Sequence, residues 1–189
     1  GQLARGFLGN AGEFGHVLVD SNGKPCSDCG QKGCLETVVS IGGIVDEARR
    51  FGIELPALHS ALDNYRVLVA SARDGDEAAC RCFQGVTEAL GQAVTSLVNV
   101  INPQLIVIGG RVIWHYPELL ETISDFVLSR CWPYSRKELR FAVATEDKHN
   151  FLHGAITLVL DKLFVPVGTG LVVDWSSHRD FIGGRGRLA

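Results

Sequence analysis

A short run of cysteines and glycines, from Cys26-Ser-Asp-Cys29 through Gly30 to Gly33-Cys34, constrains the fold of this chain more than any other feature. Three thiolates and the imidazole of His16 upstream supply the closed tetrahedral shell of a structural Zn²⁺. The CxxC spacing lets two sulfurs reach one ion from a tight turn, and the glycines let the backbone fold back toward it. We therefore predict a zinc knuckle over residues 16–34, with four ligands: His16, Cys26, Cys29 and Cys34.

Two other interpretations of this cluster stay open. The thiols are alternatively reduced surface cysteines, or Cys26 and Cys29 form a redox pair. A redox CxxC pair normally opens a helix after a strand, whereas this pair lies in a turn-rich stretch beside a third cysteine. His16 is alternatively a core histidine. The remaining cysteines lie in apolar, helix-like sequence, so we predict that they are reduced and largely buried: Cys80, Cys82 and Cys131.

Composition and charge exclude some classes of function. The chain has 189 residues, 46% of them hydrophobic and 21% charged, which is typical of a globular protein. The net charge is −3 and the cations are not clustered, which argues against nucleic-acid binding by this segment. No apolar run approaches the roughly 20 residues of a membrane span, and the first residues do not resemble a signal peptide. We expect a cytoplasmic protein, and we interpret the chain, which lacks Met, as part of a longer one.

Apolar periodicity predicts an α/β fold. The predicted strands are 16–20, 105–108 and 140–144, and the predicted helices are 35–50, 64–72, 76–101, 117–130 and 152–164. Asp76 is a plausible N-cap for the long helix, and the Asn102-Pro103 pair ends it. The continuous apolar run 105–108 favours a buried strand. One stripe of the long helix is predicted to face the core: Val86, Leu90, Val94, Leu97 and Val98. Residues 165–189 have no core-forming pattern and are typical of a mobile tail.

Three segments together resemble the ROK family of repressors, open reading frames and sugar kinases. The stretch from Gly12-Glu-Phe-Gly-His16 to Gly33-Cys34-Leu-Glu36 is similar to the family signature, in which a GE-x-GH element precedes a cysteine knuckle ending in GCLE. Residues 102–110 are similar to its NP…GG strand-turn, and Gly154-Ala155 to the start of its last helix. The resemblance covers residues 1–164. The knuckle is one residue longer than the common family pattern CxCG-x-x-GC, which changes the path of the loop and puts the position of the Cys26 sulfur in question.

The resemblance implies a fold and a ligand. The fold is the actin-like, ribonuclease-H-like lobe of the hexokinase type, usually dimeric. Glu13, His16 and Glu36 would hydrogen-bond the hydroxyls of a sugar or sugar-phosphate effector, and zinc would be structural. Alternatives remain for both carboxylates: Glu36 complements the dipole of a helix N-terminus, and Glu13 is an exposed residue of a Gly-rich turn.

The family contains regulators and kinases, and the resemblance implies different roles for this chain in each. A kinase would place ATP and Mg²⁺ near Gly109 and Gly110, which otherwise serve packing. In the family, the catalytic Asp, the first ATP loop and the regulators' DNA-binding helix-turn-helix all lie upstream of the segment matched here, so no catalytic residue is assigned. The stretch from Asn102 to Val112 looks more like the repressors, and residues 148–153 lack a Gly-Asp-Ser/Asn-Ala-Gly run frequent in the kinases.

We therefore interpret the chain as the sugar-responsive effector-binding and dimerisation domain of a ROK transcriptional regulator, which would contact DNA only through an upstream helix-turn-helix. The alternative is the C-terminal part of an ATP-dependent sugar kinase of the glucokinase or N-acetylhexosamine kinase type. A third class, a purely structural zinc module, leaves the two carboxylates without a role.

Overall fold

The computed structural model describes residues 3–56, 60–145 and 150–163. The chain divides into two compact units, each described by itself: residues 13–146 form one, and residues 1–12 with 147–189 form the other. The first unit contains a 3₁₀ turn, seven α-helices and two strands among its described residues. In order they are η1 (Phe14–His16), α1 (Glu36–Val39), α2 (Ile41–Arg50), α3 (Ala61–Arg73), α4 (Glu77–Ile101), β1 (Leu105–Ile108), α5 (Arg111–His115), α6 (Leu119–Arg130), α7 (Pro133–Arg136) and β2 (Arg140–Val143).

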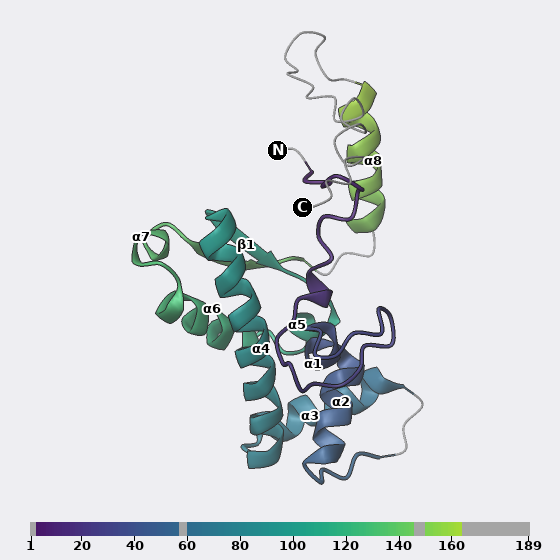
Figure 1. Ribbon diagram of the computed structural model, residues 1–189. Coiled ribbons are helices and arrows are strands. Elements are labelled where there is room, and N and C mark those ends of the chain that lie inside the picture. The colour runs from purple at the N-terminus through teal and green to yellow at the C-terminus, as the bar shows by residue number, and fades with distance from the viewer. Residues whose placement is uncertain (1–2, 57–59, 146–149, 164–189) are drawn as a thin grey trace, which may run out of the picture. The chain divides into compact units, whose positions relative to one another are not determined.

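The long helix α4 organises this unit, as Figure 1 shows. It begins where the sequence predicts, because the Asp76 side chain accepts a hydrogen bond from the Ala79 N–H at 2.8 Å. It ends at Asn102, which adopts a left-handed conformation with φ 51°. Four stripe residues face the core as predicted: Val86, Val94 and Val98 are buried, and the partly buried Leu90 packs against them. The prediction for Leu97 is wrong, since this side chain is 36% exposed.

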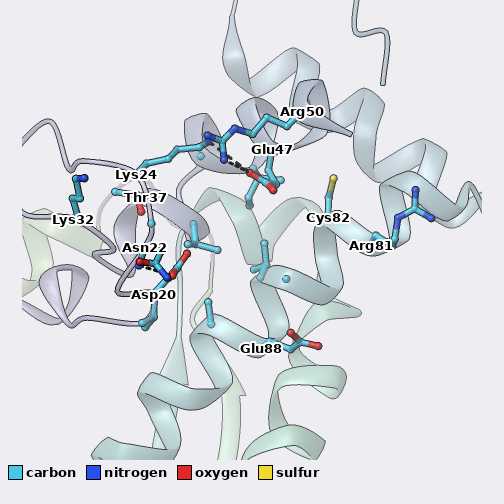
Figure 2. A pocket seen from close by; sticks show the side chains of 18 of the residues that line it. Asp20, Asn22, Lys24, Lys32, Thr37, Glu47, Arg50, Arg81, Cys82 and Glu88 are labelled. Atoms are coloured by element: carbon cyan, nitrogen blue, oxygen red, sulfur yellow. Dashed lines mark hydrogen bonds and ion pairs between the residues drawn. The ribbon is translucent and has the colours of Figure 1, made fainter. Parts of the chain in front are cut away.

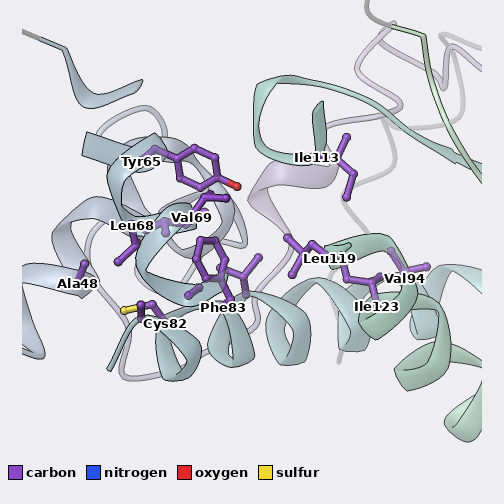
Figure 3. Packing of buried hydrophobic residues seen from close by; sticks show 14 of the residues in the cluster. Ala48, Tyr65, Leu68, Val69, Cys82, Phe83, Val94, Ile113, Leu119 and Ile123 are labelled. Atoms are coloured by element: carbon purple, nitrogen blue, oxygen red, sulfur yellow. The ribbon is translucent and has the colours of Figure 1, made fainter. Parts of the chain in front are cut away.

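Helices α2 and α3 pack with the first half of α4, and α6 packs with its second half. Figure 3 shows the contacts between Tyr65, Phe83 and their neighbours in this core. The Tyr65 and Phe83 rings meet edge to face at 5.9 Å, and the buried Tyr65 hydroxyl donates to the Val112 carbonyl at 2.9 Å. The core therefore ties α3, α4 and α5 together.

The sheet contains two parallel strands, β1 and β2, with Leu105 opposite Arg140. Helices α5, α6 and α7 form the crossover between them, so the predicted α/β class is confirmed. The prediction of a fully buried β1 is wrong. Leu105 and Val107 are each 54% exposed, because side chains alternate between two faces and only one face packs on the helices described.

Other boundaries differ from the predicted ones. Residues 16–20 do not form a strand; Leu18 makes a single antiparallel bridge to Cys34. The predicted helix 35–50 is divided at Ser40, whose extended backbone ends α1 and whose hydroxyl caps α2 by accepting from the Gly43 N–H at 3.1 Å. The short helices α5 and α7 were not predicted, and α6 begins two residues later than the predicted helix at Pro117.

Cys82 and Cys131 are buried as predicted, but Cys80 is exposed because it lies on the outer side of α4.

In the second unit, α8 (Asn150–Leu163) covers the last predicted helix except Phe164, which lies outside the described residues, as does the predicted tail 165–189. Among the helices that the structure describes, none combines the length and apolarity needed to cross a bilayer.

Candidate metal and ligand site

The loop after η1 folds back on itself as the glycines predict. Pro25 and Lys32 form an antiparallel bridge, and the Cys26 N–H donates to the Gln31 carbonyl at 2.7 Å. Gly30 and Gly33 both have a φ of +74°, a left-handed conformation that favours glycine. This closed loop brings Cys34 back toward the CxxC pair.

The four predicted metal ligands converge. The Nδ1 atom of His16 and the sulfurs of Cys26, Cys29 and Cys34 all lie within 4.8 Å of one another. His16 Nδ1 is 3.9 Å from the Cys26 sulfur, and the Cys29 and Cys34 sulfurs are 3.4 Å apart. A tetrahedral shell with Zn–S bonds of about 2.3 Å and a Zn–N bond of about 2.0 Å separates neighbouring ligand atoms by roughly 3.5–3.8 Å. The donor set and its spacing therefore fit a Zn²⁺ ion.

The electrostatics of the cluster differ among its members. The N–H groups of Cys29 and Asp28 hydrogen-bond the Cys26 sulfur and lower the pKa of that thiol. Burial raises the pKa of Cys34 to about 11. Desolvation lowers the pKa of His16, but its sulfur and carboxylate neighbours raise it, and the net shift is upward. A bound Zn²⁺ ionises its thiol ligands outright. The differences in pKa between the thiols of the metal-free cluster would therefore not persist in a zinc complex.

The second nitrogen of His16 faces carboxylates. Its Nε2 atom lies 3.3 Å from Oδ2 of Asp28 and 3.8 Å from Oε2 of Glu13. Ligand atoms of His16, Asp28 and Glu36 also lie within 4.8 Å of one another. Gly15 lies against Glu36: a Cβ at Gly15 would be in ordinary contact with that side chain, at 3.5 Å. The structure thus brings Glu13, His16 and Glu36 together, as the sequence predicted.

Asp28 is the member of this group that sequence reasoning missed. The available indication was the length of the knuckle, because an extra residue between Cys26 and Cys29 displaces the turn and adds a side chain to it. Its carboxylate is 71% exposed and lies beside the imidazole. Three carboxylates therefore surround one histidine, an arrangement rich in hydrogen-bond acceptors.

The Gly109-Gly110 turn lies at the end of β1, away from this cluster in the sequence. A Cβ on Gly109 would lie 2.9 Å from the Cβ of Ala144, and Gly110 has a φ of +109°. The indole N–H of Trp114 donates to the Ala144 carbonyl at 2.7 Å and holds α5 against the segment after β2. Local packing accounts for Gly109, and the positive φ accounts for Gly110.

A cavity of about 560 Å³ lies elsewhere, between the knuckle loop, α2 and α4 (Figure 2). None of the predicted metal or sugar residues lines it. Its wall carries Glu47, which pairs with Lys24 at 3.7 Å and with Arg50 at 3.5 Å. Because Glu47 is already paired with both cations and none of the predicted ligand residues lines the cavity, it is a weaker ligand candidate than the carboxylates around His16.

Comparison with known proteins decides the family. The model of the ROK family matches residues 1–162 of the chain. The chain belongs to the ROK family. Curated ROK relatives include a glucokinase of Halalkalibacterium halodurans, 36% identical over 77% of this chain, and the DNA-binding transcriptional dual regulator NagC of Escherichia coli, 31% identical over 84% of it.

A solved ROK hexokinase from Thermus thermophilus matches 80% of the chain with a TM-score of 0.64 and 26% identity. The actin-like, hexokinase-type fold predicted from the sequence is therefore confirmed. The chain spans 46% of the length of the glucokinase, 39% of NagC and 49% of the hexokinase, so it corresponds to about half or less of these ROK proteins.

Proposed function

We propose that this chain is the sugar-binding lobe of a ROK protein, held together locally by one structural Zn²⁺. The observation that carries the proposal is the convergence of Glu13 and Glu36 on the outer side of His16, while its inner side meets three cysteines. An isolated zinc module would not need carboxylates in that position. The proposed lobe covers residues 1–164.

The zinc site would use His16 Nδ1 and the three sulfurs as its ligands. Four protein ligands close a tetrahedral shell and leave no position for a reactive water, so the ion would organise the loop rather than catalyse a reaction. A bound ion would hold the His16 ring in one orientation, while α1 positions Glu36 and Glu13 is the residue before η1.

Sugar hydroxyls suit this arrangement because carboxylates accept hydrogen bonds from neighbouring hydroxyl groups. Glu36 begins α1 and Glu13 precedes η1, so the two acceptors come from different elements and meet at one side of the histidine. Such a geometry discriminates between sugars by the direction of their hydroxyls. The proposed ligand is a sugar or a sugar phosphate whose hydroxyl-bearing side meets these residues.

Between the two branches of the family we favour the regulator. Gly109 and Gly110 are accounted for by packing against Ala144 and by a positive φ, without a nucleotide. Similarity to NagC is consistent with this choice. The complete protein would then act as a homodimer and bind DNA through an upstream helix-turn-helix. The alternative is an ATP-dependent sugar kinase with ATP and Mg²⁺ at the Gly109-Gly110 turn. The 36% identity to a glucokinase supports it specifically.

The test uses the full-length gene product with hexoses and N-acetylhexosamines. A regulator should bind operator DNA with a strong dependence on salt, and sugar should shift that affinity by about 1–3 kcal/mol. Phosphorylation of a hexose at about 1–100 per second without salt-sensitive DNA binding would select the kinase instead. Absence of sugar binding in calorimetry would contradict the sugar-binding site, which the regulator and the kinase have in common.

A further inference from the structure

The two nitrogens of His16 have different neighbours. Nδ1 faces the sulfur cluster, with the Cys26 sulfur at 3.9 Å, and Nε2 faces Oδ2 of Asp28 at 3.3 Å. A neutral imidazole that gives Nδ1 to a metal carries its single proton on Nε2. That proton is then available to one acceptor, and Asp28 is the nearest carboxylate to it.

We propose that Asp28 is a positioning residue of the metal site: its carboxylate accepts the Nε2–H of His16 and holds the ring in the orientation that presents Nδ1 to the metal. This inference rests on the zinc site of the proposed function. A histidine ligand whose other nitrogen is fixed by a carboxylate is held in one tautomer and one ring orientation, and it is a more basic ligand.

The contacts of Asp28 with two ligands strengthen this assignment. Its backbone N–H hydrogen-bonds the Cys26 sulfur, while its side chain meets the ring of His16. Because Asp28 lies inside the CxxC turn, the turn that places the Cys26 and Cys29 sulfurs also places the carboxylate. Glu13 is a poorer partner, since its oxygen is 3.8 Å from Nε2, against 3.3 Å for the oxygen of Asp28.

The energetic role is one of orientation. Asp28 is 71% exposed, and an exposed ion pair contributes little to the free energy of folding. Removing the carboxylate should therefore leave the fold intact while freeing the ring to rotate.

The experiment measures zinc affinity by competition with a chromophoric chelator in the zinc-loaded chain. Asp28→Ala should bind zinc about 10- to 100-fold more weakly than wild type. Asp28→Asn, which keeps an acceptor oxygen, should lose less, and Ser27→Ala, in the same exposed turn, should match wild type. Nitrogen-15 NMR of the His16 ring should show a metal-bound Nδ1 and a protonated Nε2 in the wild type. Thermal unfolding of each variant in excess zinc checks that the fold persists.

Each outcome has a distinct meaning. Equal zinc affinity in wild type and Asp28→Ala overturns the role of Asp28 but does not affect the proposed zinc site. An NMR spectrum that places the metal on Nε2 has the same two consequences. A wild-type chain that retains no zinc overturns the proposed metal site itself, and the inference with it. A loss in Ser27→Ala equal to that in Asp28→Ala would show that the turn, and not the carboxylate, sets the affinity.

Discussion

The backbone carbonyl of Asp20 occupies the space in which a side chain on Gly33 would begin. The two residues lie on opposite arms of the knuckle loop, and the Val19 N–H donates to the Gly33 carbonyl at 2.9 Å beside them. Gly33 also precedes Cys34, so this close approach of two backbones sets where the last sulfur of the cluster lies.

Gly33→Ala should therefore destabilise the chain strongly. Gly30→Ala is the matched control, because Gly30 has the same φ of +74° but open space around it. The left-handed conformation alone costs an alanine about 1–2 kcal/mol, and this cost applies to both variants. The clash with Asp20 should make Gly33→Ala worse by at least about 2 kcal/mol in urea unfolding. Equal losses in the two variants would show that the loop relaxes around the new methyl group.

The metal prediction is tested by Cys34→Ser. The purified wild-type chain should contain one equivalent of zinc by elemental analysis, and Cys34→Ser should lose most of it and melt at a much lower temperature, because binding of a structural zinc contributes several kcal/mol or more to folding. Cys80→Ser is the control, since Cys80 is exposed and outside the cluster. Well under one equivalent of zinc in the wild type, with reactive knuckle thiols, would contradict the site.

The contact between α4 and α6 depends on Gly91. A Cβ on Gly91 would lie 2.8 Å from Cγ of Phe126, in an otherwise buried contact. Gly85, in the same helix, has no atom within 4 Å of the position that a methyl group would take, so Gly85→Ala should gain helix propensity of up to about 1 kcal/mol. Gly91→Ala should instead lose about 1–3 kcal/mol through overpacking. Chemical denaturation of both variants distinguishes these opposite signs, and a stabilised Gly91→Ala would refute the tight contact.

The acid side of the stability profile should depend on Glu118. Its carboxylate accepts two hydrogen bonds from Arg73 at 2.9 Å, and these bonds hold the pKa of Glu118 below its ordinary value. A depressed pKa stabilises the fold above the ordinary value of 4.5, and this contribution is lost as the pH falls through the lower, folded-state pKa. Both side chains are about half exposed, so the contribution is below about 1 kcal/mol.

Glu118→Gln should thus be less stable than wild type at pH 7 in low salt, and the difference should disappear as the pH falls through the lowered pKa of Glu118. Glu121→Gln, in the first turn of the same helix, controls for the helix dipole. The free energy of unfolding at several pH values is the measurement. A difference between wild type and Glu118→Gln that does not diminish at all as the pH falls below 4.5 would rule out the ion pair as its source.

The features that the sequence predicts correctly depend on interactions within one segment of the chain. Helix α4 follows from an N-cap, an apolar stripe and a residue pair that ends it, all read within one segment. The ligands of the knuckle follow from residue type and spacing. The exposure of Leu105 could not be predicted in the same way, because burial of a strand depends on which elements cover each face.

The residues that were missed depend on contacts between segments. Asp28 lies beside His16 only after the loop closes through Gly33 and the Cys26–Gln31 hydrogen bond. The division between α1 and α2 at Ser40 had a partial indication in Gly42-Gly43, but the close approach of Gly43 to the Thr37 carbonyl, which leaves no space for a Cβ, is a contact between two segments. Such approaches become visible only when the backbone path is known.

The proposed sugar contact is tested most directly by Glu36→Ala in the full-length protein. A lost hydrogen bond to a charged group costs about 1.5–3 kcal/mol, so the sugar should bind roughly 10- to 150-fold more weakly while the melting temperature changes little. Glu77→Ala is the matched control: Glu77 also lies in the first turn of a helix and is exposed, so it shares the favourable position near a helix dipole but not the site. Isothermal titration with hexoses and N-acetylhexosamines gives the affinities, and Glu13→Ala should weaken the same sugar. Glu36→Ala and Glu77→Ala could instead lose the same small amount of stability without any change in sugar affinity. Glu36 would then interact with the helix dipole and would not bind the sugar.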